Sequence, residues 1–462
     1  MPPTRFQAPS GTRDMYPQDL LRRRYIEKLW RDTAIRHGFE EIDGPTFEHA
    51  DLYSVKSGEG ILSELFQVFS GKDAGELDAI RAGKSAPYAL RPEFTPTLAR
   101  MYAAKAGSLP KPTKWFWMQN CYRAERQQRG RLREFGQWNC DILGLPGPAG
   151  DIEIVKVCRD MLQAGGLTPA NIKIRVNDRR LVVAMARQAG VSKDKESAFL
   201  NFLDGRSKRN APDNAGTLAS LGLDATAAER FDGICRQIGQ QHASGKLDPT
   251  ALGLDDMTLE AQGLYDVIRE CNTGGDPWCV FDPGIVRGLA YYTGVVFEVI
   301  VDGERAVAGG GRYDNLIELF GGPPTPACGF GMGDVVLGLV LQDKGIMPVD
   351  SSLLDRLSVP PTSHCPQAFV LPANDTLGDS VVQEIVDELR GFGLHARCSY
   401  KTTKNIGKLL QDAVAQKSKL AVIIESADEA TIKDLRTNTQ DAARTKLADL
   451  PRVIAARLAA AN

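Results

Sequence analysis

The strongest indication of the fold class is the stretch WFWMQNCYRAERQQRGRLREFGQWNCDILG, which runs from Trp115 to Gly144. Apolar and polar residues alternate in its two outer parts, as in strands with one buried face and one open face. Its middle part is rich in arginine and turns around Gly130. The stretch therefore predicts two antiparallel strands joined by a positively charged tip.

The charged tip has two interpretations. It carries five arginines: Arg123, Arg126, Arg129, Arg131 and Arg133. A hairpin that extends into solvent commonly carries such charge without binding anything. Guanidinium groups also match phosphate oxygens, so the tip is equally suited to grip a phosphate and to contact nucleic acid. Glu125 can hold one of these arginines or accept a hydrogen bond from a base amine.

Similar strand patterns recur along the first three quarters of the chain, at 87–95, 172–178, 279–285, 291–301 and 305–314. They predict an antiparallel sheet. A polar, helical pattern from about Arg180 to about Glu270 separates them and predicts a helical insertion in the sheet domain. A further helix is expected from Leu20 to Gly38.

The last quarter of the chain predicts a separate domain. A stretch rich in proline and serine begins at Lys344, and strand and helix patterns alternate after it. Such alternation is typical of a small α/β domain with parallel strands. We therefore expect a first domain at 1–345, a linker at 346–364 and an α/β domain at 365–462.

Composition excludes several classes of protein. The chain has 462 residues, a formal net charge of −2 and nine cysteines, with no CxxC pair. Scattered cysteines predict reduced thiols in the cytoplasm, with no zinc or other metal site. No apolar run is long enough to cross a bilayer, so no membrane contact is expected. The low net charge argues against non-specific nucleic-acid binding, and any basic surface has to be local.

Three short motifs bring charged and aromatic residues together. Glu93 and Thr95 alternate in LRPEFTPTLARM, so an extended chain would place them on one face. Arg312 follows three glycines in AVAGGGRYDNLI, which allow a close backbone approach. In RGLAYYTGVVFE, Arg287 precedes Tyr291 and Tyr292, which would point to opposite faces of a strand.

The order and spacing of these motifs resemble the class II aminoacyl-tRNA synthetases, and in detail the histidyl-tRNA synthetase family. The resemblance covers nearly the whole chain, and RGLAYYTGVVFE is its most specific part. It implies an α+β catalytic domain with a six- or seven-stranded, mostly antiparallel sheet and a helical insertion. A small α/β anticodon-binding domain would follow. The segment GFEEIDGPTFEHADLY resembles the dimer-interface element, which implies a homodimer.

The resemblance also implies a role for individual residues. Arg123 and Arg287 would be the catalytic residues on the α-phosphate of ATP. The histidine-binding residues would be Glu93, Thr95, Gln137, Asp141, Tyr291 and Tyr292. The ATP-binding residues would be Arg123, Glu125, Arg131, Phe135 and Arg312. Gln128 would contact the acceptor end of the tRNA.

The implied activity is that of a histidine–tRNA ligase. The enzyme would join histidine to ATP as histidyl-adenylate and then transfer the histidyl group to the 3′ end of tRNA(His). Histidine, ATP with Mg²⁺, and tRNA(His) would be its partners. An extra 5′ guanosine on the tRNA is left open by the sequence.

One departure from the family pattern supports an alternative. The family has Glu-Arg at the head of a helix after a glycine-rich turn, and the arginine binds the γ-phosphate. Val335 and Val336 occupy those positions here, after Asp334. The alternative is a regulatory or binding protein related to the regulatory subunit of ATP phosphoribosyltransferase. Retention of the arginines in the charged tip and of the C-terminal domain argues against it. A class II synthetase for another amino acid is disfavoured by the tyrosine pair.

Overall fold

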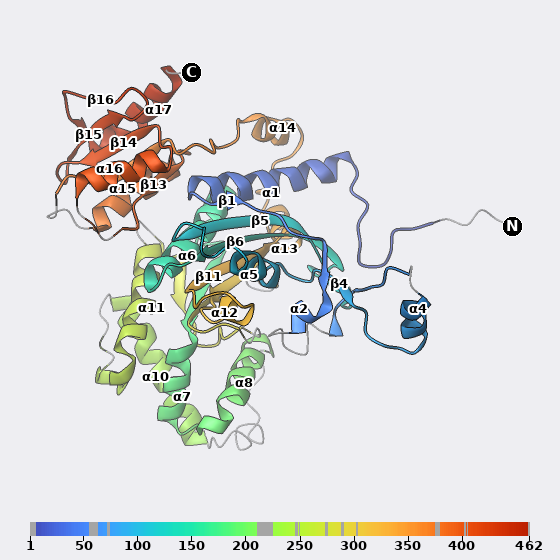
Figure 1. Cartoon of the computed structure of the whole chain (residues 1–462). Coiled ribbons are helices and arrows are strands. Elements are labelled where there is room, and N and C mark those ends of the chain that lie inside the picture. Colours follow the sequence, from blue (N-terminus) through green and yellow to red (C-terminus); the bar gives the residue numbers. More distant parts are fainter. Residues whose placement is uncertain are drawn as a thin grey trace. The chain divides into compact units, whose positions relative to one another are not determined.

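The computed structural model describes residues 6–54, 63–71, 74–209, 225–244, 248, 250–272, 276–287, 291–301, 304–374, 379–401, 403 and 405–460. The chain divides into two compact units. The first unit comprises Met1–Arg23 and Ile42–Met347, and the second comprises Arg24–Glu41 and Pro348–Asn462. The boundary between Arg23 of the first unit and Arg24 of the second lies within helix α1 (Pro17–Arg36). Figure 1 shows the helices and strands of both units, coloured along the sequence.

The large sheet of the first unit confirms the mostly antiparallel fold, and its seven strands match the upper expected number. They run in the order β5-β6-β11-β10-β9-β7-β8. Their bounds are β5 Thr113–Tyr122, β6 Glu134–Leu143, β7 Lys173–Asp178, β8 Cys279–Phe281, β9 Val295–Ile300, β10 Ala308–Arg312 and β11 Ala327–Gly333. Strand β1 (Glu40–Glu41) belongs to the second unit. Only the pair β7–β8 is parallel among these seven strands.

The hairpin β5–β6 forms as the sequence predicts. Its register pairs Thr113 with Leu143 and Tyr122 with Glu134, so the arginine-rich tip lies between Arg123 and Arg133. Helix α6 (Pro148–Ala164) packs against β6 and β11, and α13 (Asp334–Asp343) follows β11 directly. Helices α5 (Thr95–Ala103) and α12 (Leu316–Leu319) contribute to one hydrophobic core together with Trp117 and Tyr313.

A small second sheet lies in the same unit. It has the order β2-β4-β3, with β2 at Phe47–His49, β3 at Gln67–Val68 and β4 at Tyr88–Leu90. Helix α2 (Ala50–Ser54) contacts β2 and β4, and helix α4 (Ala74–Arg81) lies between β3 and β4 in the chain. The segment after β4 is not a continued strand as expected, because Pro96 in the first turn starts α5 at Thr95.

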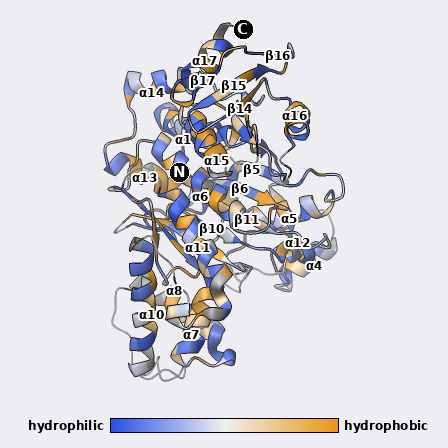
Figure 2. Cartoon of the chain, turned by 90° about the vertical axis from the view of Figure 1, so that its left-hand side faces the viewer, coloured by the Kyte–Doolittle hydropathy of each residue, from blue (hydrophilic) through white to orange (hydrophobic). Residues whose placement is uncertain are grey.

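The predicted helical insertion is confirmed in the residues that the structure describes. It contains α7 (Arg179–Ala189), α8 (Glu196–Arg209), α10 (Ala225–Ser244) and α11 (Thr258–Cys271). Three short 3-10 turns, Lys193–Lys195, Thr250–Leu252 and Asp255–Met257, accompany these helices. Figure 2 shows hydrophilic and hydrophobic stretches alternating along α10, as on an amphipathic helix.

The second unit contains the predicted α/β fold. Its six-stranded sheet has the order β13-β12-β14-β15-β16, and β17 also pairs with β15. The strands are β12 Ala368–Pro372, β13 Ala396–Cys398, β14 Leu420–Ile424, β15 Glu429–Asp434, β16 Thr439–Gln440 and β17 Thr445–Lys446. Strand β12 is parallel to β13 and to β14, as expected, whereas β15 is antiparallel to β14. The helices are α14 Asp350–Ser358, α15 Asp379–Gly391, α16 Ile406–Ala415 and α17 Leu450–Ala460, with a 3-10 turn at Leu447–Asp449.

The segment expected to be a linker contains a helix, α14, whose first-turn Ser352 accepts a hydrogen bond from the Val349 backbone.

Among the described residues, no helix is both long enough and apolar enough to cross a membrane.

Candidate active site

A cavity of about 950 Å³ opens in the first unit, over the middle of the large sheet. Its walls come from the segment before α5, from the hairpin β5–β6, and from β9, β10 and β11. Eleven of the thirteen residues singled out from the sequence line it: Glu93, Thr95, Arg123, Glu125, Arg131, Phe135, Gln137, Asp141, Arg287, Tyr291 and Tyr292. Segments almost two hundred residues apart in the chain therefore meet at one site.

Two buried carboxylates and the two tyrosines that donate hydrogen bonds to them form a group that we name the carboxylate cluster. Its members are Glu93, Asp141, Tyr291 and Tyr313. The Tyr291 hydroxyl donates to Glu93 Oε2 at 3.0 Å, and the Tyr313 hydroxyl donates to Asp141 Oδ1 at 2.5 Å. The rings of Tyr291 and Tyr313 meet edge to face, with centroids 6.0 Å apart. The cluster is thus a rigid, polar pocket inside an apolar core.

Each carboxylate of this cluster keeps one oxygen for a ligand. Glu93 Oε1 and Asp141 Oδ2 are buried and have no hydrogen-bond partner within the part of the chain that the structure describes. Burial raises the pKa of Asp141 to about 7, although the Tyr313 hydrogen bond opposes the shift. Burial also raises the pKa of Glu93, against the nearby charge of Arg123. A ligand that donates hydrogen bonds and carries positive charge would satisfy both groups.

Two glycines make room for the charged side chains. A Cβ on Gly329 of β11 would lie 2.0 Å from Asp141 Oδ1, and a Cβ on Gly309 of β10 would lie 2.3 Å from Arg287 Nη1. Real Cβ atoms do not approach other atoms so closely. Glycine at these positions of β10 and β11 therefore lets the Asp141 carboxylate and the Arg287 guanidinium lie close to the backbone.

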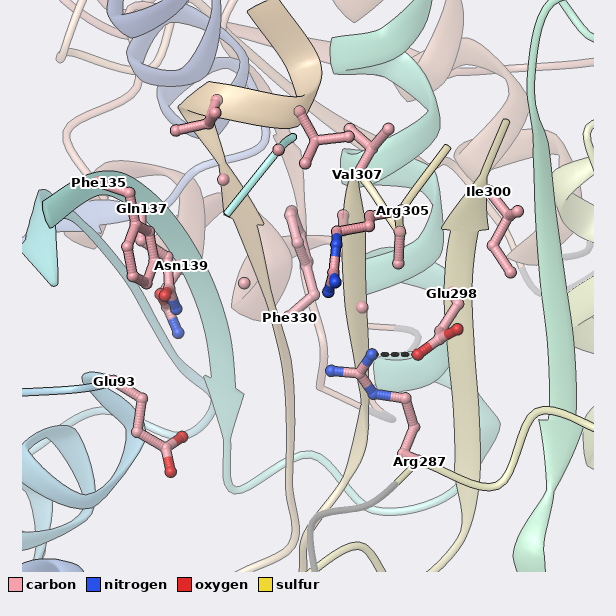
Figure 3. Close-up of a pocket in the computed structure, with 18 of the residues that line it drawn as sticks. Glu93, Phe135, Gln137, Asn139, Arg287, Glu298, Ile300, Arg305, Val307 and Phe330 are labelled. Carbon is pink, nitrogen blue, oxygen red and sulfur yellow. Dashed lines mark hydrogen bonds and ion pairs between the residues drawn. The ribbon is translucent and has the colours of Figure 1, made fainter. Parts of the chain in front are cut away.

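Arg123 and Arg287 both line the cavity beside the carboxylate cluster. Arg287 forms an ion pair with Glu298 of β9, which Figure 3 marks with a dashed line. Its φ angle of 56° is in the left-handed region, an unfavourable conformation for a residue with a side chain. Arg123 donates from Nε to the Pro92 carbonyl at 3.0 Å, and its guanidinium lies 5.3 Å from the centre of the Phe135 ring.

Further arginines gather near the tip of the hairpin. We name Arg129, Arg131 and Arg305 the arginine rim. Arg131 pairs with Glu125 at 2.6 Å, and burial raises the pKa of Glu125 against the charge of Arg131. Arg305 comes from the turn between β9 and β10. Val336, in the first turn of α13, lines the cavity at the same place as Gly130.

Arg312, which was expected to bind ATP, does not line the cavity. Its Nε donates to both oxygens of Asp151 in α6, at 3.1 and 3.0 Å, and its Nη2 donates to the Gly147 carbonyl at 2.8 Å. Asp314 accepts from Nη1 at 3.0 Å. Arg312, the last residue of β10, therefore points to α6, whereas the hydroxyl of the next residue, Tyr313, donates to Asp141 in the cavity wall.

Gln128 also lies outside the cavity wall, on the exposed tip of the hairpin. Its side-chain oxygen accepts a hydrogen bond from Arg305 Nη2.

Several cavity residues were not expected from the sequence, among them Tyr313, Asn139, Glu298 and Arg305. Strand alternation could have found Asn139 and Glu298, because each lies two residues from a side chain that also lines the cavity. Asn139, for example, accepts from Gln137 Nε2 at 2.7 Å. Tyr313 lies just beyond the end of β10, so alternation does not mark it. Nothing in the sequence marks Arg305, which lies in a turn.

The adjacent tyrosines also differ from expectation. Both Tyr291 and Tyr292 are buried, both line the cavity, and their ring centroids are 4.9 Å apart. Strand β9 begins only at Val295, so strand alternation does not apply to this pair.

Comparison with known proteins identifies the family. The model of the family described as histidyl-tRNA synthetase matches residues 11–333, which is more than half of the chain. The histidine–tRNA ligase of Opitutus terrae is 39% identical over 359 residues, which are 74% of this chain and 76% of that protein. That of Haloquadratum walsbyi is 34% identical over 443 residues, which are 93% of this chain and 94% of that protein.

Solved structures agree with the fold. The histidyl-tRNA synthetase from Nostoc sp. PCC 7120 matches 98% of this chain and all of its own with a TM-score of 0.59, at 21% identity. A structure described as an ATP phosphoribosyltransferase regulatory subunit/histidyl-tRNA synthetase, from Bacillus halodurans, matches 92% of this chain and all of its own with a TM-score of 0.56, at 20% identity. These likenesses concern the fold alone, whereas the sequence matches are specific. The chain belongs to the histidyl-tRNA synthetase family.

Proposed function

We propose that the protein is a histidine–tRNA ligase, which activates histidine with ATP and transfers it to the 3′ end of tRNA(His). The observation that carries the proposal is the carboxylate cluster, in which Glu93 and Asp141 each retain a buried oxygen with no partner among the described residues. Histidine brings an ammonium group and a ring N–H, which are the donors that such oxygens need. Membership of the family supports the same substrate.

In this proposal, the pocket distinguishes histidine by its ring. Asp141 accepts a hydrogen bond from one ring nitrogen, while the Tyr292 hydroxyl is available to the other. Glu93, Thr95 and Gln137 hold the ammonium group. An amino acid without a second ring nitrogen would leave a buried polar group without a partner, which costs binding energy.

The first reaction step needs alignment and charge rather than a base. The histidine carboxylate is already ionised, so it attacks the α-phosphorus of ATP directly and pyrophosphate leaves. Arg123 and Arg287 are the two cations beside the carboxylate cluster, and they would neutralise the charge that develops on the α-phosphate. Phe135, against which Arg123 lies, would stack on the adenine. In the second step, the terminal adenosine of the tRNA takes the histidyl group.

The cavity also suits a nucleotide bound with Mg²⁺. Carboxylate oxygens are the ligands that Mg²⁺ prefers, and Glu125, Glu298 and Glu304 all line the cavity. No three such side chains are grouped as a metal site among the described residues, so one of these carboxylates would hold the ion together with the phosphates, where it would neutralise part of their charge.

We further propose a cytoplasmic homodimer that reads tRNA(His). No disulfide joins any of the nine cysteines, which suits a reducing compartment. The α/β unit at Pro348–Asn462 would bind the anticodon. Gln128, exposed at the tip of the hairpin, would contact the acceptor end of the tRNA.

ATP–pyrophosphate exchange with each of the twenty amino acids in turn tests the proposal. We expect exchange with histidine alone. Charging of tRNA(His) transcripts with and without an additional 5′ guanosine would then test the second step and the contribution of Gln128. A folded protein with no exchange for any amino acid would favour the regulatory alternative, and exchange with a different amino acid would overturn the pocket assignment.

A further inference from the structure

The cavity has to accommodate the end of a triphosphate without the arginine that the family pattern has at position 336. Val336 is 6% exposed and cannot bind phosphate. A triphosphate in a cleft is unfavourable unless nearby cations offset its charge. If the protein uses ATP as proposed above, a different cation is required.

Six arginines line the cavity, and carboxylates already hold four of them. Arg129 pairs with Glu304 at 3.0 Å and with Asp343 at 2.5 Å. The other three pairs are Arg131 with Glu125, Arg175 with Asp282, and Arg287 with Glu298. The remaining two, Arg123 and Arg305, have no ion pair with a carboxylate in the described ranges. Arg123 lies against Phe135 and beside the carboxylate cluster, which suits the α-phosphate.

Arg305 lies where the missing side chain would be. A Cβ placed on Gly130 would be 3.2 Å from Val336 Cγ2 and 3.7 Å from Arg305 Cδ, so both side chains meet the same point of the hairpin tip. Figure 3 shows the Arg305 guanidinium directed into the same space as that of Arg287. The turn that carries it is fixed at its base, where Val307 N donates to the Val299 carbonyl at 2.8 Å.

The contact that Arg305 makes in this structure is easily exchanged. Its described hydrogen bond goes to the neutral side-chain oxygen of Gln128. The bond to Gln128 carries charge on the arginine only, whereas a bond from a guanidinium to a phosphate joins opposite charges and can be bidentate. Phosphate would therefore displace Gln128.

We propose that Arg305 binds the γ-phosphate of ATP in place of the arginine that this chain lacks at position 336. The cation reaches the phosphate from the β9–β10 turn instead of from the head of α13. This inference rests on the proposed function for its ligand, but it concerns a different residue and can fail separately.

Binding of ATP, ADP and AMP by the full-length protein tests it directly. Arg305→Ala should weaken ATP binding about 10-fold to 100-fold, the usual range for a hydrogen bond to a charged group. ADP and AMP binding should change less than about threefold, because they lack the γ-phosphate. Arg305→Lys should restore part of the ATP affinity, because it keeps the charge but not the planar fork. Arg269→Gln, at an exposed residue of α11 outside the cavity wall, removes the same charge and should change none of the three affinities.

Kinetics give a second measurement. In histidine-dependent exchange, Arg305→Ala should raise the KM for ATP by a similar factor and leave the KM for histidine unchanged. Binding of a non-hydrolysable histidyl-adenylate analogue, which has no β- or γ-phosphate, should also stay unchanged.

The outcomes separate the two proposals. Equal losses for ATP and AMP, or no loss for ATP in a folded variant, would overturn the role of Arg305 whether or not the protein charges tRNA. A wild type that binds ATP with the predicted dependence on Arg305 but shows no exchange would retain Arg305 as a γ-phosphate ligand and overturn the ligase.

Discussion

The carboxylate cluster and the arginine rim share one cavity but are built differently. In the carboxylate cluster, Glu93 and Asp141 are at most 4% exposed, and a tyrosine hydroxyl donates a hydrogen bond to one oxygen of each. Gly329 has no side chain that would occupy the space of the Asp141 carboxylate. In the arginine rim, side chains are partly exposed and held by ion pairs or by an amide. Buried hydrogen bonds fix a geometry, whereas exposed ion pairs exchange readily.

This difference agrees with where the chain departs from its family. Under the proposed function, the carboxylate cluster selects one ring among twenty side chains, so its geometry cannot vary. The arginine rim would supply positive charge near phosphates, and charge can come from more than one segment. A valine at position 336 is thus tolerable if Arg305 supplies the cation, while a comparable change at Asp141 would not be. The four predictions that follow test this distinction.

The largest effect is expected at Arg287, which lies next to both groups of residues. Arg287→Ala removes a fixed charge beside the α-phosphate, and such losses typically reduce the rate about 100-fold or more. Histidine-dependent ATP–pyrophosphate exchange measures the effect. Arg287→Lys should recover part of the rate, and a thermal melt should show that both variants fold. Near-normal exchange by Arg287→Ala would remove Arg287 from the catalytic residues.

A change within the carboxylate cluster should affect histidine alone. Asp141→Asn replaces an acceptor-only group by an amide whose orientation is ambiguous, and it also loses the charged partner of Tyr313. We expect the KM for histidine to rise about 10-fold to 100-fold, with the KM for ATP changed less than about threefold. Equal increases in both constants would show that Asp141 only supports the structure.

The pH dependence of histidine binding should show the titration of Asp141. Burial raises its pKa to about 7, so the carboxyl takes up a proton as the pH falls through 7 and loses its charge. Between pH 8 and pH 6, the wild type should therefore lose about 10-fold more affinity than Asp141→Asn. The ring of histidine titrates equally in both experiments, so the difference isolates the protein group. Parallel affinity curves for the wild type and Asp141→Asn would show that Asp141 does not titrate between pH 6 and pH 8.

The smallest effect is expected at Val336. Val336→Arg restores the family residue, but a second guanidinium would then crowd Arg305 and the Gly130 contact. We expect exchange activity to change by less than about threefold. A wild type without exchange that gains it in this variant would instead identify the protein as a synthetase that has lost its function, and the regulatory alternative would gain support.

The sequence predicted well what depends on local pattern. Alternating strands in the hairpin, the helical insertion and the α/β unit all follow from periodicity, and the structure contains each of them. Site residues found through motifs also assemble in one cavity, with the exceptions of Arg312 and Gln128.

Two features of the cavity leave no sign in the sequence. AVAGGGRYD offers three glycines and therefore no side chains from which to read the buried face of β10, so the sequence does not indicate that Tyr313 lines the cavity and Arg312 does not. Arg305 is a turn residue without a pattern, and its proximity to Gly130 and Val336 joins three segments that are distant in sequence. Only the fold brings such segments together.

The absence of side chains at Gly309 and Gly329 has a consequence for inhibition and resistance. A compound that lies on the backbone of these two strands contacts positions at which any substitution would collide with Arg287 or Asp141. A mutation that blocks the compound there would also displace a residue on which substrate binding depends. Resistance to such a compound would have to arise at other walls of the cavity.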